Sequence, residues 1–82
     1  MDEKRLRYSR HARQRMRKRL LLHEEVDAIV RWPAWRRATH RDTIKHYGYS
    51  DDGRLIGVVT DRDERLVLSV IDERRRERRR RQ

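Results

Sequence analysis

The stretch LIGVVTDRDERLVLSVI, residues 55–71, decides the fold. Residues 55–60 and 66–71 are rich in β-branched and aliphatic side chains, which favour strands. The charged link at 61–65 is too short for a parallel crossover, so the two strands should pair antiparallel. In the second strand, alternation assigns one set of side chains to the covered core and the other set to the opposite face. The core set is Leu66, Leu68 and Val70, and the opposite set is Val67, Ser69 and Ile71.

Upstream of this hairpin, Asp52 and Gly53 form a second turn signal, so residues 43–50 should be another antiparallel strand. Residues 35–39 are a weaker strand candidate. Two sets of side chains alternate along 43–50, and the pattern leaves open which set points inward. They are Ile44, His46 and Gly48 on one side, and Thr43, Lys45, Tyr47 and Tyr49 on the other.

The N-terminal part is helical in pattern. Ala12, Met16 and Leu20 recur every four residues across 9–20, with Ser9 as a candidate N-cap. A second helix starts at HEEV, residues 23–26, and should stop at Trp32 because the following proline disfavours helical geometry there. Trp32 and Trp35 are expected to be core residues beside this break.

These elements predict an α+β fold of two N-terminal helices packed on a three- to four-stranded antiparallel meander sheet. Residues 1–73 should form a single compact domain, because a chain of 82 residues is too small to divide its core. Residues 74–82, RRRERRRRQ, read as an arginine-rich tail that carries no apolar stripe and is ordered only when phosphates neutralise it.

Charge narrows the functional classes. The net charge is +10 and arginine greatly outnumbers lysine, which favours phosphate-rich partners, RNA or DNA, over acidic metabolites. The sequence has no cysteine, and its four histidines lack a recognisable metal spacing, so we expect no metal and no cofactor. It shows neither a signal peptide nor an apolar span, which predicts a cytoplasmic protein with no membrane partner.

The motif His11-Ala12-x-x-Arg15-Met16-x-x-Arg19, followed by Glu25-Val26, Pro33 and the strand at 53–59, resembles a family of small bacterial and phage proteins of unknown function. The match runs from Tyr8 to Ile71. The order of elements is also similar to that of the ribonuclease-toxin fold shared by RelE, ParE and BrnT proteins. This resemblance implies helices packed on an antiparallel sheet and an arginine-rich end.

One departure concerns the turn after the first helix. That family usually has glycine after the Arg19 position, whereas this chain has Leu20, Leu21 and Leu22. Without glycine the helix lacks an easy left-handed stop, so the turn should differ or the helix should run longer.

His11, Arg15 and Arg19 follow one another at one-turn spacing on the first helix and are the candidate catalytic residues, with Tyr47 as a further candidate. Arginine would stabilise charge on a phosphodiester while imidazole moves a proton. Alternatively, His11 only packs or hydrogen-bonds, and the arginines pair with acids of the second helix. Candidate nucleic-acid contacts are Arg7, Arg10, Lys45, Arg54, Arg75, Arg76, Arg79 and Arg80.

Two functions stay open at this point. The first is a metal-independent endoribonuclease toxin of a toxin–antitoxin pair, acting on RNA, including ribosome-bound RNA, and inhibited by an acidic antitoxin protein. The alternative is a non-enzymatic basic nucleic-acid-binding protein or phage adaptor. Homodimerisation through an exposed edge strand is compatible with either.

Overall fold

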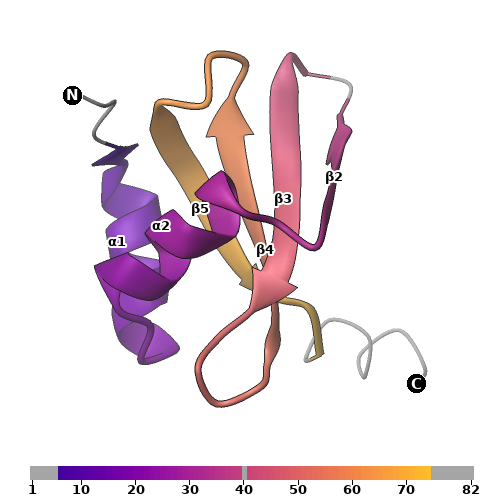
Figure 1. The fold of residues 1–82 in the computed structure, drawn as a ribbon. Helices are drawn as coiled ribbons and strands as arrows, with labels where there is room; N and C mark the ends of the chain where they lie inside the picture. The colour runs from indigo at the N-terminus through magenta and orange to yellow at the C-terminus, as the bar shows by residue number, and fades with distance from the viewer. Residues whose placement is uncertain (1–5, 40, 75–82) are drawn as a thin grey trace, which may run out of the picture.

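The computed structural model describes residues 6–39 and 41–74. It shows an α+β fold in which two helices lie on one face of a five-stranded sheet (Figure 1). In chain order the elements are β1 (Arg7–Tyr8), α1 (Arg10–Lys18), α2 (His23–Arg31), β2 (Trp35–Ala38), β3 (Thr43–Tyr49), β4 (Leu55–Asp61) and β5 (Leu66–Asp72). The α+β class and the two N-terminal helices are confirmed.

The sheet is mixed, and the prediction of a purely antiparallel sheet was wrong in this respect. The strand order is β1-β5-β4-β3-β2, and β2 to β5 form the expected antiparallel meander. At the far edge, β1 pairs parallel with β5. The N–H of Arg7 donates to the Arg65 carbonyl at 2.8 Å, and the N–H of Ser9 donates to the Val67 carbonyl at 2.9 Å. A strand of two residues has no periodicity from which it can be predicted.

Side-chain and backbone polar groups close the two turns of the meander. In the β3–β4 turn, Gly53 adopts φ +85° and the N–H of Ser50 donates to the Arg54 carbonyl at 2.9 Å, as the Asp-Gly signal predicted. In the β4–β5 turn, one Asp61 carboxylate oxygen accepts from the N–H groups of Arg65 and Leu66. These backbone donors hold the pKa of Asp61 below its usual value.

Strand β5 does not alternate as predicted, because a β-bulge interrupts it. Ser69 pairs with Val59, but Val67 pairs with Thr60, which leaves Leu68 without a Cα partner on β4. The extra residue moves Val67 to the same face as Val70, and both are buried whereas Leu68 is only half-buried. The assignment of Leu66 and Leu68 to the core, with Val67 on the opposite face, was therefore wrong.

The inward set of β3 is Ile44, His46 and Gly48. His46 pairs with Val58 and Gly48 pairs with Ile56, and these β4 residues belong to the core beneath the helices. A Cβ at Gly48 would lie 2.9 Å from Cγ1 of Ile29, so α2 packs on β3 so closely that a larger residue would have to displace Ile29. Lys45, Tyr47 and Tyr49 consequently project from the sheet face that the helices do not cover.

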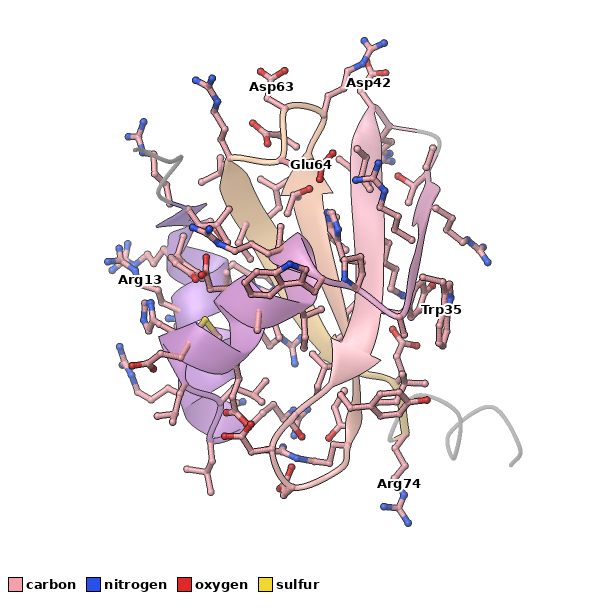
Figure 2. The ribbon with its side chains drawn as sticks, viewed as in Figure 1. Arg13, Trp35, Asp42, Asp63, Glu64 and Arg74 are labelled. Carbon is pink, nitrogen blue, oxygen red and sulfur yellow. The ribbon has the colours of Figure 1, made fainter. Side chains whose placement is uncertain are left out.

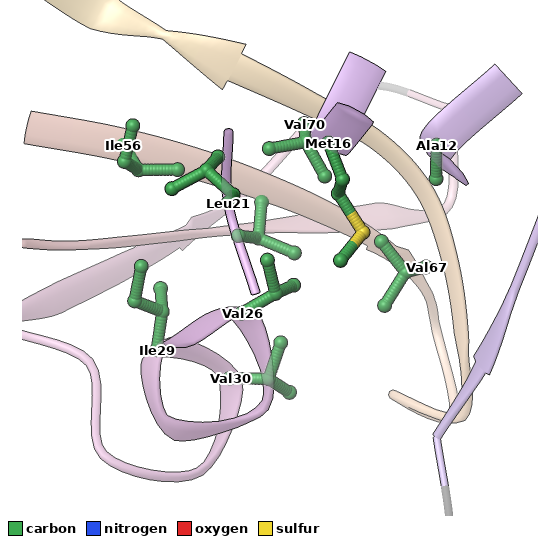
Figure 3. Close-up of a cluster of buried hydrophobic side chains, with 10 residues drawn as sticks. Ala12, Met16, Leu21, Val26, Ile29, Val30, Ile56, Val67 and Val70 are labelled. Carbon is green, nitrogen blue, oxygen red and sulfur yellow. The ribbon is translucent and has the colours of Figure 1, made fainter. Parts of the chain in front are cut away.

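The core is thin and lies between the helices and the sheet. Ala12 and Met16 of α1 meet the β5 side of the sheet, and Val26 and Ile29 of α2 meet β3 and β4 (Figure 3). Ser9 caps α1 as predicted, since its hydroxyl oxygen accepts from the N–H of Ala12 at 3.0 Å. The remaining buried apolar residues are Leu21, Val30, Ile56, Val58, Val67 and Val70.

Helix α1 ends with a residue in the left-handed conformation even though that residue is leucine and not glycine. Leu20 adopts φ +56°, its N–H donates to the Arg17 carbonyl at 3.2 Å, and the N–H of Leu21 donates to the Met16 carbonyl at 2.9 Å. These two bonds form a Schellman motif, and Leu21 and Met16 are both buried beneath it. The helix ends at Lys18, so the leucines neither extend it nor abolish the motif.

The two tryptophans are not core residues, contrary to the prediction. Trp32 is 76% exposed, because α2 ends at Arg31 and the helix turns Val26, Ile29 and Val30 toward the core instead. Trp35 is 46% exposed and lies on β2, an edge strand of the sheet. Across residues 6–39 and 41–74, neither helix has the length and apolarity needed to cross a bilayer.

Candidate nucleic-acid interface on helix α1

Helix α1 presents one buried side and one wide basic side. Ala12 and Met16 pack against the sheet, so the rest of the helix surface is free to face solvent. Arg13 extends outward from the helix, away from the sheet (Figure 2). An open hollow on this helix is lined by His11, Gln14, Arg15, Arg17 and Lys18.

His11 and Arg15 both border this hollow, as their one-turn spacing predicted. His11 is exposed and Arg15 is half-buried, so the imidazole is accessible from solvent beside a guanidinium. Among the residues that the structure describes, neither side chain pairs with Glu24, Glu25 or Asp27 of α2. The reading in which Arg15 locks the two helices together through an ion pair does not hold here.

Helix α1 gathers more unneutralised charge than any other element in the described part of the chain. Elsewhere, four cations contact carboxylates closely: Arg31 with Asp27 at 3.0 Å, Arg36 with Glu64 at 2.9 Å, Lys45 with Glu73 at 2.7 Å and Arg54 with Asp52 at 2.9 Å. Among the described residues, the arginines outside α1 and its C-cap that have no carboxylate within ion-pair distance are spread over separate elements and loops, and they are Arg7, Arg37, Arg41, Arg65 and Arg74. Within residues 6–39 and 41–74, no cation of α1 lies within ion-pair distance of a carboxylate. These cations are Arg10, Arg13, Arg15, Arg17 and Lys18.

Arg19 and Arg54 contact each other at the C-terminal end of α1. Arg19 is the C-cap of α1 and does not line the hollow, and its carbonyl accepts from Nη1 of Arg54 at 2.7 Å. The same Arg54 side chain donates from Nε to Asp52 at 2.9 Å and lies 3.9 Å from Asp72. Arg54 therefore ties the helix end to the β3–β4 turn.

The structure does not bring Tyr47 to the hollow. Tyr47 projects from the uncovered face of the sheet, whereas α1 lies on the other face. Lys45 shares that uncovered face, where it is buried against Glu73. Arg7 and Arg10 are exposed at the β1 and α1 starts, while Arg75, Arg76, Arg79 and Arg80 lie outside the described residues.

A second histidine does not lie beside His11 in the described part of the chain. The ring of His23 makes an edge contact with Tyr8, with ring centroids 4.5 Å apart. His46 is fully buried, with Nε2 3.0 Å from Oγ1 of Thr60. Burial lowers the pKa of His46, although Glu64 nearby opposes this shift, so its ring is neutral and enclosed at pH 7. His40 lies outside the described residues.

Sequence reasoning missed an aromatic pair on the uncovered sheet face. Trp35 and Tyr47 are directly paired across β2 and β3, and their rings stack with centroids 4.8 Å apart and planes 12° from parallel. Nζ of Lys45 lies 5.0 Å from the centroid of the Tyr47 ring. The alternation of Lys45, Tyr47 and Tyr49 was a signal for this face, but the partner strand was too weak in sequence to set its register.

Comparison with known proteins gives no relative, because no protein-family model, curated protein or solved structure matches the chain. What the protein binds is accordingly inferred from its own side chains. In the described residues, no cluster of three or more histidine and carboxylate groups is arranged to hold a metal ion. The most distinctive surface is the unneutralised basic side of α1.

Proposed function

We propose that the protein binds the phosphate backbone of nucleic acid through helix α1. One observation carries the proposal: five cations without carboxylate partners in the described structure lie together on α1, whereas the other unpaired arginines are spread over separate elements. A guanidinium group that is already solvated and not engaged internally offers its donors to phosphate at little cost. The Gln14 amide in the same hollow adds a neutral hydrogen-bonding group.

The residues that line the hollow set the number of phosphate contacts that we expect, and with it the salt dependence of binding. Arg15, Arg17 and Lys18 line it and are the cations best placed to share one phosphate chain. Three phosphate contacts correspond to a slope of about −2 for log affinity against log salt concentration on a single strand. The remaining α1 cations, Arg10 and Arg13, would add long-range attraction more than direct contact.

Fluorescence anisotropy with labelled RNA and DNA oligonucleotides at several salt concentrations tests this proposal. The triple variant Arg15→Gln, Arg17→Gln, Lys18→Gln should lose most of the affinity and most of the salt slope. A matched variant, Arg41→Gln with Arg62→Gln and Arg65→Gln, removes the same three positive charges from exposed side chains outside α1 and should bind nearly as the wild type does. Equal losses in both variants would show that general charge, and not α1, governs binding.

A second candidate function is cleavage of the bound RNA by a metal-independent endoribonuclease toxin. The observation that favours it is the shared position of His11 and Arg15 at one open hollow. There, Arg15 would stabilise the negative charge that develops on phosphorus, and His11 would transfer a proton to or from the 2′-hydroxyl or the leaving oxygen. The fold would then be a small variant of the RelE and BrnT arrangement, with an acidic antitoxin covering α1.

Substitution of His11 distinguishes a ribonuclease from a protein that only binds RNA. If the protein is a ribonuclease, wild type expressed in a bacterial host should arrest growth and fragment RNA, and His11→Ala should do neither while still binding RNA. If wild type and His11→Ala both leave growth and RNA intact while the salt-dependent binding persists, the protein is a binding module only. We place binding first because, among the described residues, no second histidine, carboxylate or tyrosine lines the hollow with His11.

A further inference from the structure

The Trp35–Tyr47 pair forms an aromatic platform at the edge of the sheet. Trp35 belongs to the edge strand β2 and stacks on Tyr47 of β3, so one face of the indole is covered and the other has no neighbouring strand. Figure 2 shows Trp35 projecting at the outer side of β2. At 46% exposed, this indole leaves a large apolar surface in water.

The platform is held in place from several sides. Trp35 and Tyr47 are in direct cross-strand register. The N–H of Ala34, the residue before Trp35, donates to the Tyr47 carbonyl at 2.7 Å. The ammonium of Lys45 lies near the Tyr47 ring and is fixed by Glu73 at 2.7 Å. A flat ring whose position is already fixed can stack a planar ligand without first losing side-chain freedom.

The charges around the platform select the ligand. Arg37 lies on the same sheet face as Trp35, two residues along β2, and is exposed. Within the described residues Arg37 has no carboxylate in contact, whereas the Glu73 charge on this face is neutralised by Lys45. The local combination is a free aromatic plane beside an unneutralised guanidinium, which suits a base attached to a phosphate better than an apolar peptide.

We propose that the exposed indole face of Trp35 stacks an unpaired base of single-stranded nucleic acid, with Arg37 contacting the adjacent phosphate. This inference rests on the proposed function and specifies its ligand as a single strand. Bases within a duplex are already stacked on one another and do not offer a free ring face, so they cannot occupy the platform without unstacking. Backbone binding by α1 would hold duplex and single strand alike.

Tryptophan fluorescence gives a direct test, because the chain has two tryptophans. The variant Trp32→Phe keeps Trp35 as its sole tryptophan, and Trp35→Phe keeps only Trp32. Each is titrated with an oligouridylate of about ten nucleotides, with the corresponding oligothymidylate, and with an RNA duplex of equal length. The single strands should quench Trp35 and the duplex should not, while Trp32 should respond to none of them.

Affinity measurements complete the test. Trp35→Ala should weaken oligouridylate binding about ten-fold or more without changing duplex binding, and Trp35→Phe should retain most of the affinity because a ring remains. Trp32→Ala is the control, since it removes an indole that is even more exposed but lies outside the pair. Circular dichroism and thermal unfolding confirm that each variant is folded, and the Trp35→Phe result stands even if Trp35→Ala is unstable.

The outcomes separate the two proposals. Unchanged Trp35 fluorescence and an unchanged oligouridylate affinity in Trp35→Ala, with salt-dependent duplex binding intact, would overturn base stacking and leave the α1 proposal standing. Absence of binding to every oligonucleotide would overturn both. Equal quenching of Trp35 by oligothymidylate supports base stacking without a preference for RNA, and equal quenching by the duplex and the single strands would refute a preference for unpaired bases.

Discussion

Replacing Leu20 with glycine should make the protein more stable. Leu20 holds φ +56° at the end of α1, a left-handed conformation that costs an L-residue about 1–2 kcal/mol and costs glycine almost nothing. Against this gain, glycine loses about 0.5–1 kcal/mol more backbone entropy on folding. The leucine side chain is 84% exposed, so its removal forfeits only about 0.3 kcal/mol of apolar burial.

The net expectation for Leu20→Gly is a gain of about 0.5 kcal/mol in the free energy of unfolding, since the two costs offset only part of the relieved strain. For a domain of this size that gain raises the melting temperature by about 2–4 °C. Urea denaturation measures it as a higher midpoint with an unchanged slope. The hydrogen bonds of the Schellman motif involve only backbone groups, so glycine keeps them.

Leu20→Ala is the matched control, because alanine removes the side chain but keeps the Cβ that makes φ +56° costly. It should be slightly less stable than wild type, so that the difference between the glycine and alanine variants isolates the backbone term. If Leu20→Gly is no more stable than Leu20→Ala, the left-handed strain at this position is not real and the reasoning fails. RNA affinity and its salt slope should be the same in both variants.

Three further variants test contacts that hold the domain together. Because burial lowers the pKa of His46, the unfolded chain binds the proton more readily, so stability should be full above about pH 6.5 and fall below it by up to about 1.4 kcal/mol per pH unit. His46→Leu should remove that part of the pH dependence in urea titrations at pH 7.5 and 5.5. Gly48→Ala should cost about 1–3 kcal/mol by pushing on Ile29, and should cost less in an Ile29→Ala background if the contact is the cause. Glu25→Ala should lower the free energy of unfolding by about 1–2 kcal/mol, as measured by thermal unfolding. The reason is that the Glu25 carboxylate accepts from backbone N–H groups at both the α2 start and the β3–β4 turn. An unchanged free energy of unfolding would show that these hydrogen bonds are dispensable.

The parts of the fold that were predictable are those with strong local patterns. Ser9 before a four-residue apolar repeat, Asp52-Gly53 between two strand-like runs, and the proline after α2 each marked a boundary that the structure confirms. The errors arose where tertiary contacts set the outcome. The bulge at Leu68 reverses which side chains of β5 are buried, and the sequence around it alternates as smoothly as an unbulged strand.

The candidate site residues also fall into those that local spacing predicted and those that tertiary structure placed elsewhere. One-turn spacing within a single helix was enough to place His11 and Arg15 beside the same hollow. Tyr47 was attached to them by chemistry alone, and the choice of face on β3, which the pattern left open, puts it on the other side of the sheet. The stack with Trp35 depends on the register between β2 and β3, which long-range pairing fixes and residue types do not.

The cations of helix α1 repel one another, and the helix dipole favours only the three in its last turn, Arg15, Arg17 and Lys18. Like charges face one another at four-residue spacing, as in Arg13 with Arg17 and Arg15 with Arg19, and each such pair costs about 0.2–0.5 kcal/mol. Arg10 also places a positive charge at the positive end of the helix dipole, where the first turn has no acid. The Ser9 cap and the burial of Ala12 and Met16 must offset these costs. A single glutamate at position 13 would relieve part of this repulsion, so a helix that carries five cations and no acid is better suited to holding an external polyanion than to stabilising its own fold.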